Sequence, residues 1–145
     1  MSQLPALAAI LLGGIAIAVQ APLNGALGRT LGGALPAAAV SFAVGFVALL
    51  VLSFATVSNP FGRIPAVPLW QWAGGLLGAY YVWSVIWGVP SLGVVSAMAA
   101  LILGQMTGAL VLDAVGAFGV PVQPISLTRI LAVGLVAAGL VLSRL

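Results

Sequence analysis

Amide side chains lie inside long apolar stretches of this sequence, where they could bind a solute. Gln20 and Asn24 are four residues apart in the first stretch, so a helix would place both on one face. Pro22 lies between them and removes the backbone hydrogen bond to the Ala18 carbonyl. Two interpretations stay open. In one, a broken helix exposes these groups for binding; in the other, the helix ends at Pro22 and the amides cap the turn.

A cluster of aromatic residues and another amide lie near the middle of later stretches. Tyr80 and Tyr81 belong to the third stretch, away from the membrane interfaces where tyrosine is usual, and Trp83 follows on a similar face. Gln105 lies near the middle of the fourth stretch, where an amide needs another helix or a ligand as its partner. We therefore predict a substrate-binding set of Gln20, Asn24, Tyr80, Tyr81, Trp83 and Gln105.

Asp113 is the one carboxylate of the sequence, and we expect it to mark the end of the fourth helix. Arg129 lies near the start of the fifth helix, where a positive charge is unfavourable for the helix dipole. An anionic partner would offset that cost, and Asp113 is the available protein group. We predict an Asp113–Arg129 ion pair with a structural role or a role in ion coupling.

The composition sets the class of protein. Hydrophobic residues make up 63% of the chain and charged residues 3%, against roughly 25% charged residues in a soluble domain. This predicts an all-α integral membrane protein. The sequence has no His or Cys, so we expect no enzyme activity, no metal site and no cofactor. The arginines are scattered singly, so we expect no nucleic-acid partner.

Five apolar stretches are long enough to approach the roughly 20 residues that cross a bilayer. Gly88 to Ser91 separates the third stretch from the fourth, which predicts a very short turn between antiparallel neighbours. We predict a single transmembrane domain, residues 1–145, with helices at 4–27, 35–57, 69–87, 92–112 and 127–143.

The four arginines are divided evenly between the two sides of the membrane that five spans define. Arg63 and Arg129 fall on one side, and Arg29 and Arg144 on the other. Because an excess of Lys and Arg sets the orientation of a membrane protein, an even division gives no preferred orientation. This predicts dual topology, in which the chain inserts both ways and forms an antiparallel homodimer.

Several motifs follow one another in an order that is typical of a known family. They are Pro22–Arg29 (PLNGALGR), Ser41–Gly45 (SFAVG), Gly74–Val82 (GGLLGAYYV), Gly104-Gln105, Asp113-xx-Gly116-xx-Gly119 and Arg129. With these motifs, nearly the whole chain resembles the short YdcZ-type proteins, a five-helix, half-size branch of the drug/metabolite transporter superfamily. The first stretch lacks the embedded glutamate of the four-helix multidrug branch, which argues against proton-coupled cation export by that branch's mechanism.

The resemblance implies a half-transporter of the bacterial cytoplasmic (inner) membrane, one half of a ten-helix inverted repeat. We expect a secondary transporter or facilitator that moves a small, partly apolar organic solute by alternating access as an antiparallel homodimer. Two alternatives stay open. One is a half-transporter that needs an oppositely oriented homologous partner, and the other is a membrane scaffold that transports nothing.

Overall fold

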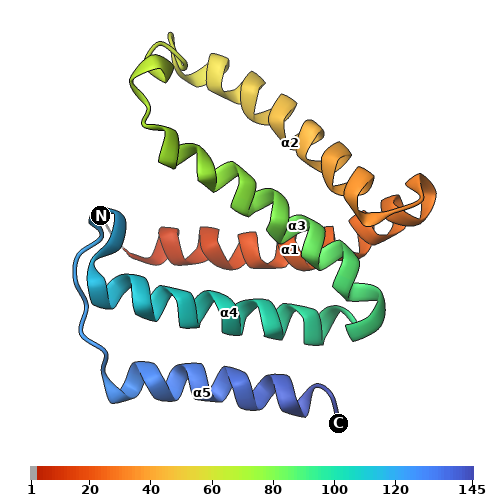
Figure 1. The fold of residues 1–145 in the computed structure, drawn as a ribbon, viewed down its shortest axis with the longest axis vertical. Helices are drawn as coiled ribbons and strands as arrows, with labels where there is room; N and C mark the ends of the chain where they lie inside the picture. The colour runs from red at the N-terminus through yellow and green to blue at the C-terminus, as the bar shows by residue number, and fades with distance from the viewer. Residues whose placement is uncertain (1–2) are drawn as a thin grey trace. The chain divides into compact units, whose positions relative to one another are not determined.

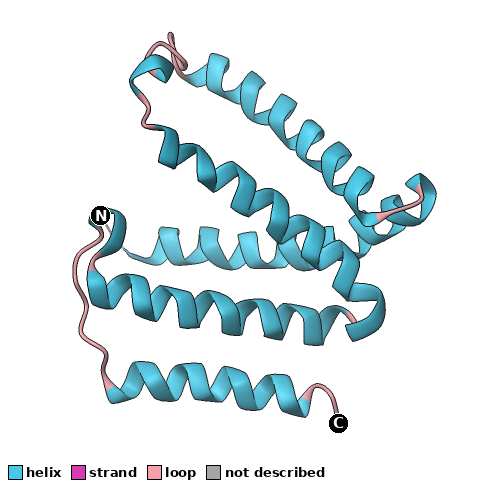
Figure 2. Ribbon diagram, viewed as in Figure 1, coloured by secondary structure: helices cyan, strands magenta, loops and turns pink. Residues whose placement is uncertain are grey.

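The computed structural model describes residues 3–145, and this range is helical throughout apart from its connections (Figure 1, Figure 2). The all-α fold class is therefore confirmed. Short 3-10 segments occupy Ile64–Ala66, Leu69–Trp72 and Ala117–Gly119. The described α-helices are α1 (Gln3–Leu31), α2 (Ala34–Thr56), α3 (Ala73–Leu92), α4 (Val94–Val115) and α5 (Leu127–Leu142).

The chain forms two compact units. The first ends at Pro90 and contains α1, α2 and nearly all of α3, while the second runs from Ser91 to Leu145 and contains α4 and α5.

Helix α1 continues through Pro22 for nine further residues, so neither a helix end nor a broken helix at Pro22 is correct. Proline removes one N–H from the helical ladder, but opening the ladder in an apolar solvent would leave more polar groups unpaired. The helix ends instead at Leu31. There Gly32 adopts a φ of +78° and the Gly33 N–H donates to the Gly28 carbonyl at 2.9 Å, the usual glycine-based helix stop.

The core of the first unit lies where its three helices converge. Ala37 and Ala38 of α2 pack with Val82 and Ile86 of α3. Gly28 brings α1 into this cluster, because a Cβ there would lie 3.5 Å from Ile86 Cγ2 and 3.7 Å from Ala37 Cβ. Small residues thus allow close packing of α1 against α2 and α3.

The predicted turn at Gly88–Ser91 is wrong, since α3 continues to Leu92. Pro90 lies in its last turn, where the one lost hydrogen bond affects little helix beyond it. The break between the two helices falls on Gly93, whose φ of +77° is a conformation that glycine adopts readily, and α4 begins at the next residue.

The second unit is a helical hairpin, with α4 and α5 antiparallel and side by side (Figure 1). At one end the Ser143 hydroxyl donates to the Ser96 hydroxyl at 3.0 Å, and the Ser96 hydroxyl donates to the Ser143 carbonyl at 3.1 Å. At the other end α4 runs on to Val115, so Asp113 lies in its last turn, at the predicted end of the fourth helix.

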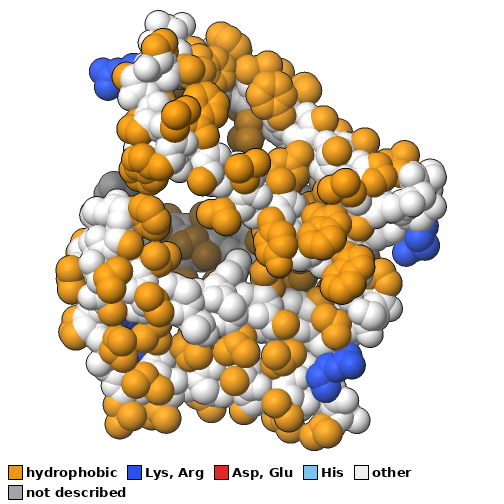
Figure 3. All heavy atoms as spheres, in the orientation of Figure 1, with side chains coloured by type: hydrophobic (Ala, Val, Ile, Leu, Met, Phe, Trp, Pro, Cys, Tyr) orange, Lys and Arg blue, Asp and Glu red, His pale blue; other side chains and the backbone are white. Residues whose placement is uncertain are grey.

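Apolar side chains cover most of the face shown in Figure 3, as expected of a surface in contact with lipid. By length and composition, three of the helices in residues 3–145 could cross a membrane: α1, α2 and α4. Helix α5 is apolar but has 16 residues, just below the usual range for a span. Helix α3 has 20 residues and is rich in glycine and aromatic residues.

Candidate solute-binding cavity

The first unit contains an open, groove-like cavity of about 430 Å³, within the range of about 300–1,000 Å³ that is usual for small-molecule sites. All three helices of the unit contribute to it, and no charged side chain lines it. Its lining is Gln20 of α1, Ser41, Phe42, Gly45, Phe46 and Leu49 of α2, and Tyr81 and Val82 of α3.

One face of α2 forms most of the cavity wall. Ser41, Phe42, Gly45, Phe46 and Leu49 recur at the spacing of a helical stripe, so they line the same side. The wall is hollowed at Gly45, where an added Cβ would meet nothing within 4 Å. The Phe42 ring contacts α3 at Gly78, because a Cβ at Gly78 would lie 3.5 Å from the Phe42 Cζ atom.

The polar groups that line the cavity have unused hydrogen-bonding capacity. Within residues 3–145, the Gln20 amide, the Ser41 hydroxyl and the Tyr81 phenol each have no hydrogen-bond partner. In contrast to Ser41 and Ser53 of α2, which have no such bond within residues 3–145, some hydroxyls of the chain's helices bond back to a carbonyl of their own helix. Examples are Thr30 to Ala26, Thr56 to Leu52, Ser84 to Tyr81 and Thr107 to Leu103. The polar groups at the cavity are therefore available to a ligand.

The residues predicted to bind substrate lie in different places. Gln20 and Tyr81 line this cavity. Asn24 is buried on the inner face of α1, with 7% of its surface exposed, and is not part of the lining. Gln105 belongs to the second unit, where it is exposed on α4 and has no hydrogen-bond partner among the residues described.

Tyr80 and Trp83 form an aromatic row with Trp87 along another face of α3. Tyr80 is 66% exposed, and its ring centroid is 5.9 Å from that of Trp83. The Trp83 and Trp87 rings stack at 6.0 Å. Neither Tyr80 nor Trp83 lines the cavity.

Six lining residues are not in the predicted substrate set: Ser41, Phe42, Gly45, Phe46, Leu49 and Val82. A sequence signal existed for three of them, because a serine and two phenylalanines lie on one stripe of α2. The stripe alone could not show whether it faces a cavity, lipid or another helix.

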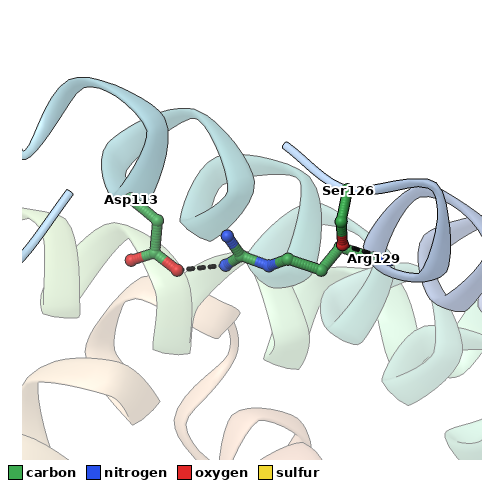
Figure 4. A network of polar contacts seen from close by, with 3 residues as sticks. All are labelled: Asp113, Ser126 and Arg129. Atoms are coloured by element: carbon green, nitrogen blue, oxygen red, sulfur yellow. Dashed lines mark hydrogen bonds and ion pairs between the residues drawn. The ribbon is translucent and has the colours of Figure 1, made fainter. Parts of the chain in front are cut away.

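The second unit contains the predicted ion pair, and Figure 4 shows the Arg129 guanidinium pointing at the Asp113 carboxylate. The Ser126 hydroxyl accepts the Arg129 backbone N–H at 3.3 Å and caps α5. The Asp113 carbonyl accepts the Gln123 N–H at 2.9 Å, which ties the loop to α4. Within the described chain, Arg129 Nη1 is buried and has no partner.

Titratable metal ligands are scarce in this chain. Residues 3–145 contain no group of three His, Cys, Asp or Glu side chains that could hold a metal ion. The cavity offers aromatic surface and neutral hydrogen-bonding groups, which suit reversible binding of a solute better than covalent chemistry.

An apolar helical surface and an uncharged cavity in a three-helix unit define the class as a multi-pass membrane protein with a candidate solute site. Residues 5–142 match the family described as "Putative inner membrane exporter, YdcZ". The chain belongs to this family.

The chain is also similar to the inner membrane protein YdcZ of Escherichia coli (strain K12). The two are 31% identical over 125 residues, which cover 85% of this chain and 84% of that protein. No solved structure matches this chain. The protein is thus a multi-pass protein of the bacterial inner membrane, and its family is described as one of inner membrane exporters.

Proposed function

We propose that the protein is a secondary transporter that binds a small organic solute in the cavity of the first unit and exports it. The observation that carries this proposal is the cavity of about 430 Å³ with three polar groups that lack partners within residues 3–145. Leaving polar groups unpaired in an apolar environment is costly. A solute that satisfies them would gain binding energy, and the export direction follows the family's description.

We further propose that the working unit is an antiparallel homodimer, in which five spans of each copy form half of a ten-helix inverted repeat. The even division of the four arginines supports this, because it leaves neither orientation favoured. Inverted pairs place their substrate site near the membrane midplane, where the cavities of two copies would meet. Alternating access would then expose this shared site to each side in turn.

A transport screen tests the solute-binding part of the proposal. Proteoliposomes containing the full chain are loaded with a mixture of small organic solutes, and the exit rate of each is followed by mass spectrometry. Gly45→Leu should slow the exit of the transported solute at least about tenfold, because the new side chain would occupy the hollow in the cavity wall. If no solute leaves faster than from empty liposomes, the proposal fails and a membrane scaffold is favoured.

Gly14→Leu provides the matched control for the screen. A Cβ at Gly14 also meets nothing within 4 Å, but Gly14 does not line the cavity. This variant adds the same apolar bulk to a membrane helix and should transport as the native chain does. An equal loss in both variants would mean that the Gly45 effect does not arise from the cavity.

Labelling of single cysteines tests the antiparallel pair. The native chain has no cysteine, so Ser2→Cys and Leu145→Cys each introduce one thiol. In intact cells, dual topology predicts that an impermeant maleimide labels about half of each variant and that the rest is labelled only after lysis. Complete protection or complete labelling of either terminus would refute the homodimer and favour an oppositely inserted partner.

A further inference from the structure

The cavity lining indicates the charge of the solute. Its polar groups are an amide, a hydroxyl and a phenol, and no arginine or aspartate takes part. A charged group moved from water to such a site would lose its hydration without gaining an ion partner, and that loss is large in an apolar medium. The cavity should therefore prefer a solute with no net charge.

The hydrogen-bonding groups indicate which functional group the solute carries. The Gln20 side chain presents one acceptor oxygen and two N–H donors side by side, and it has no partner within the described residues. Another amide, or the lactam edge of a heteroaromatic ring, matches this pattern with a donor and an acceptor of its own. The Ser41 and Tyr81 hydroxyls can each donate or accept a further hydrogen bond.

The aromatic side chains indicate the shape of the solute. Phe42, Phe46 and Tyr81 supply three rings to one cavity. The Phe42 ring also packs against α3 at Gly78. Aromatic rings favour offset-stacked or edge-to-face contact with other rings. A volume of about 430 Å³ lies near the lower end of the range for small-molecule pockets, which suits one or two rings.

From this geometry, and resting on the proposed function, we infer that the solute is an uncharged, planar heteroaromatic amide or lactam. Its ring stacks among Phe42, Phe46 and Tyr81. Its amide edge bonds to Gln20, with Ser41 within the same cavity to receive a further polar group.

Three probes of nearly equal size test the charge requirement. Nicotinamide is neutral, nicotinate is an anion, and 1-methylnicotinamide is a cation. Binding of each to the full chain in lipid nanodiscs is measured by ligand-observed NMR titration, with empty nanodiscs as the background. Nicotinamide should bind at least about tenfold more tightly than either charged probe. Equal binding of a charged probe would overturn the charge assignment.

A fourth probe and two variants test the shape and the place of binding. Cyclohexanecarboxamide keeps the amide but loses the flat ring, and it should bind at least about threefold more weakly than nicotinamide. Gly45→Leu should abolish nicotinamide binding and Gln20→Leu should weaken it about tenfold, whereas Gly14→Leu should leave it unchanged. Unchanged binding in Gly45→Leu would overturn the assignment to this cavity.

Failure of this inference and failure of the proposed function give different results. If none of the probes binds but the transport screen finds another solute that Gly45→Leu blocks, the substrate class is wrong and the transport function stands. If no solute is transported at all, the proposed function itself is wrong.

Discussion

Replacing Asp113 by asparagine should weaken the α4–α5 hairpin through the loss of its ion pair with Arg129. Asparagine keeps the size of the side chain and one acceptor oxygen, so the change removes charge more than shape. The loop contact from Gln123 uses the Asp113 backbone carbonyl and should survive. The expected loss therefore reflects the side-chain pair.

The exposed fraction of the two side chains sets the coupling free energy that we expect for the ion pair. The Arg129 and Asp113 side chains are 33% and 32% exposed, which places the pair between two known limits. Exposed ion pairs contribute roughly 0.2–1 kcal/mol, and hydrogen bonds that involve charged groups contribute roughly 1.5–3 kcal/mol. We expect a coupling free energy of about 1–2 kcal/mol for this partly buried pair.

A double-mutant cycle measures this coupling. Asp113→Asn, Arg129→Gln and the double variant are unfolded in mixed micelles, and helix content is followed by far-ultraviolet circular dichroism. The four tryptophans all belong to the first unit, so tryptophan fluorescence would report poorly on the hairpin. Losses that add to within about 0.5 kcal/mol would refute the energetic role of the pair.

Arg144→Gln supplies the control cycle with Asp113→Asn. Arg144 Nη1 donates to the Leu92 carbonyl at 3.2 Å, near the end of the hairpin where Ser96 meets Ser143. Removing this charge tests whether any arginine in the unit couples to Asp113 at long range. The losses of unfolding free energy in Arg144→Gln and Asp113→Asn should add in the double variant, because the Arg144 and Asp113 side chains have different partners.

Three further predictions concern packing. Gly116→Ala should destabilise the chain by about 1–3 kcal/mol in thermal unfolding, because φ is +62° and the new Cβ would lie 2.7 Å from Val122 Cγ2; an unchanged melting temperature would contradict this geometry. Gly28→Leu should cost about 1–3 kcal/mol by overfilling the junction of the first unit, and stability equal to that of the native chain would refute the close packing there. Ser96→Ala and Ser143→Ala should show a coupling of about 0.6 kcal/mol in a double-mutant cycle, as for other hydrogen bonds between membrane helices; strict additivity would argue against the direct bond.

The positions of the helices could be predicted from the sequence because hydropathy dominates folding in a bilayer. The predicted and observed starts of the second, third, fourth and fifth helices differ by at most four residues, with Ala73 against residue 69 as the largest difference. The ion pair was also predictable. An apolar chain offers few partners to a charged side chain, and Asp113 is the one carboxylate with which Arg129 can pair.

Neither Pro22 nor Pro90 interrupts the helix that contains it. Rules from soluble proteins end a helix before proline, where water can satisfy the freed carbonyl. In hydrocarbon, unwinding the helix would leave several backbone groups without hydrogen bonds, which costs more free energy than the one hydrogen bond that proline removes. Both Pro22 and Pro90 accordingly lie inside helices, and the helix breaks fall on Gly32 and Gly93, which tolerate positive φ.

The candidate site was only partly predictable because sequence spacing does not say what a helix face packs against. Gln20 and Asn24 are four residues apart and point in similar directions, yet one lines the cavity and the other is buried outside its lining. Residues around Asn24 pack inward with Ala21 and Gly28, while Gln20 lies before the point where the helices converge. Whether a neighbouring helix covers each of these side chains depends on tertiary packing, which no local pattern encodes.

Ser41 shows what the structure adds to such a sequence. A serine in a membrane helix needs no partner from elsewhere, because its hydroxyl can bond to a carbonyl of the preceding turn, as Thr30 and Thr56 do. For that reason serine seldom marks a site in a hydropathy profile. The Ser41 hydroxyl does not make this bond within the described chain, and it lines a cavity with an equally unpartnered amide from Gln20. An unpartnered hydroxyl and an unpartnered amide that line the same solute-sized space are stronger evidence for a binding site than polarity alone.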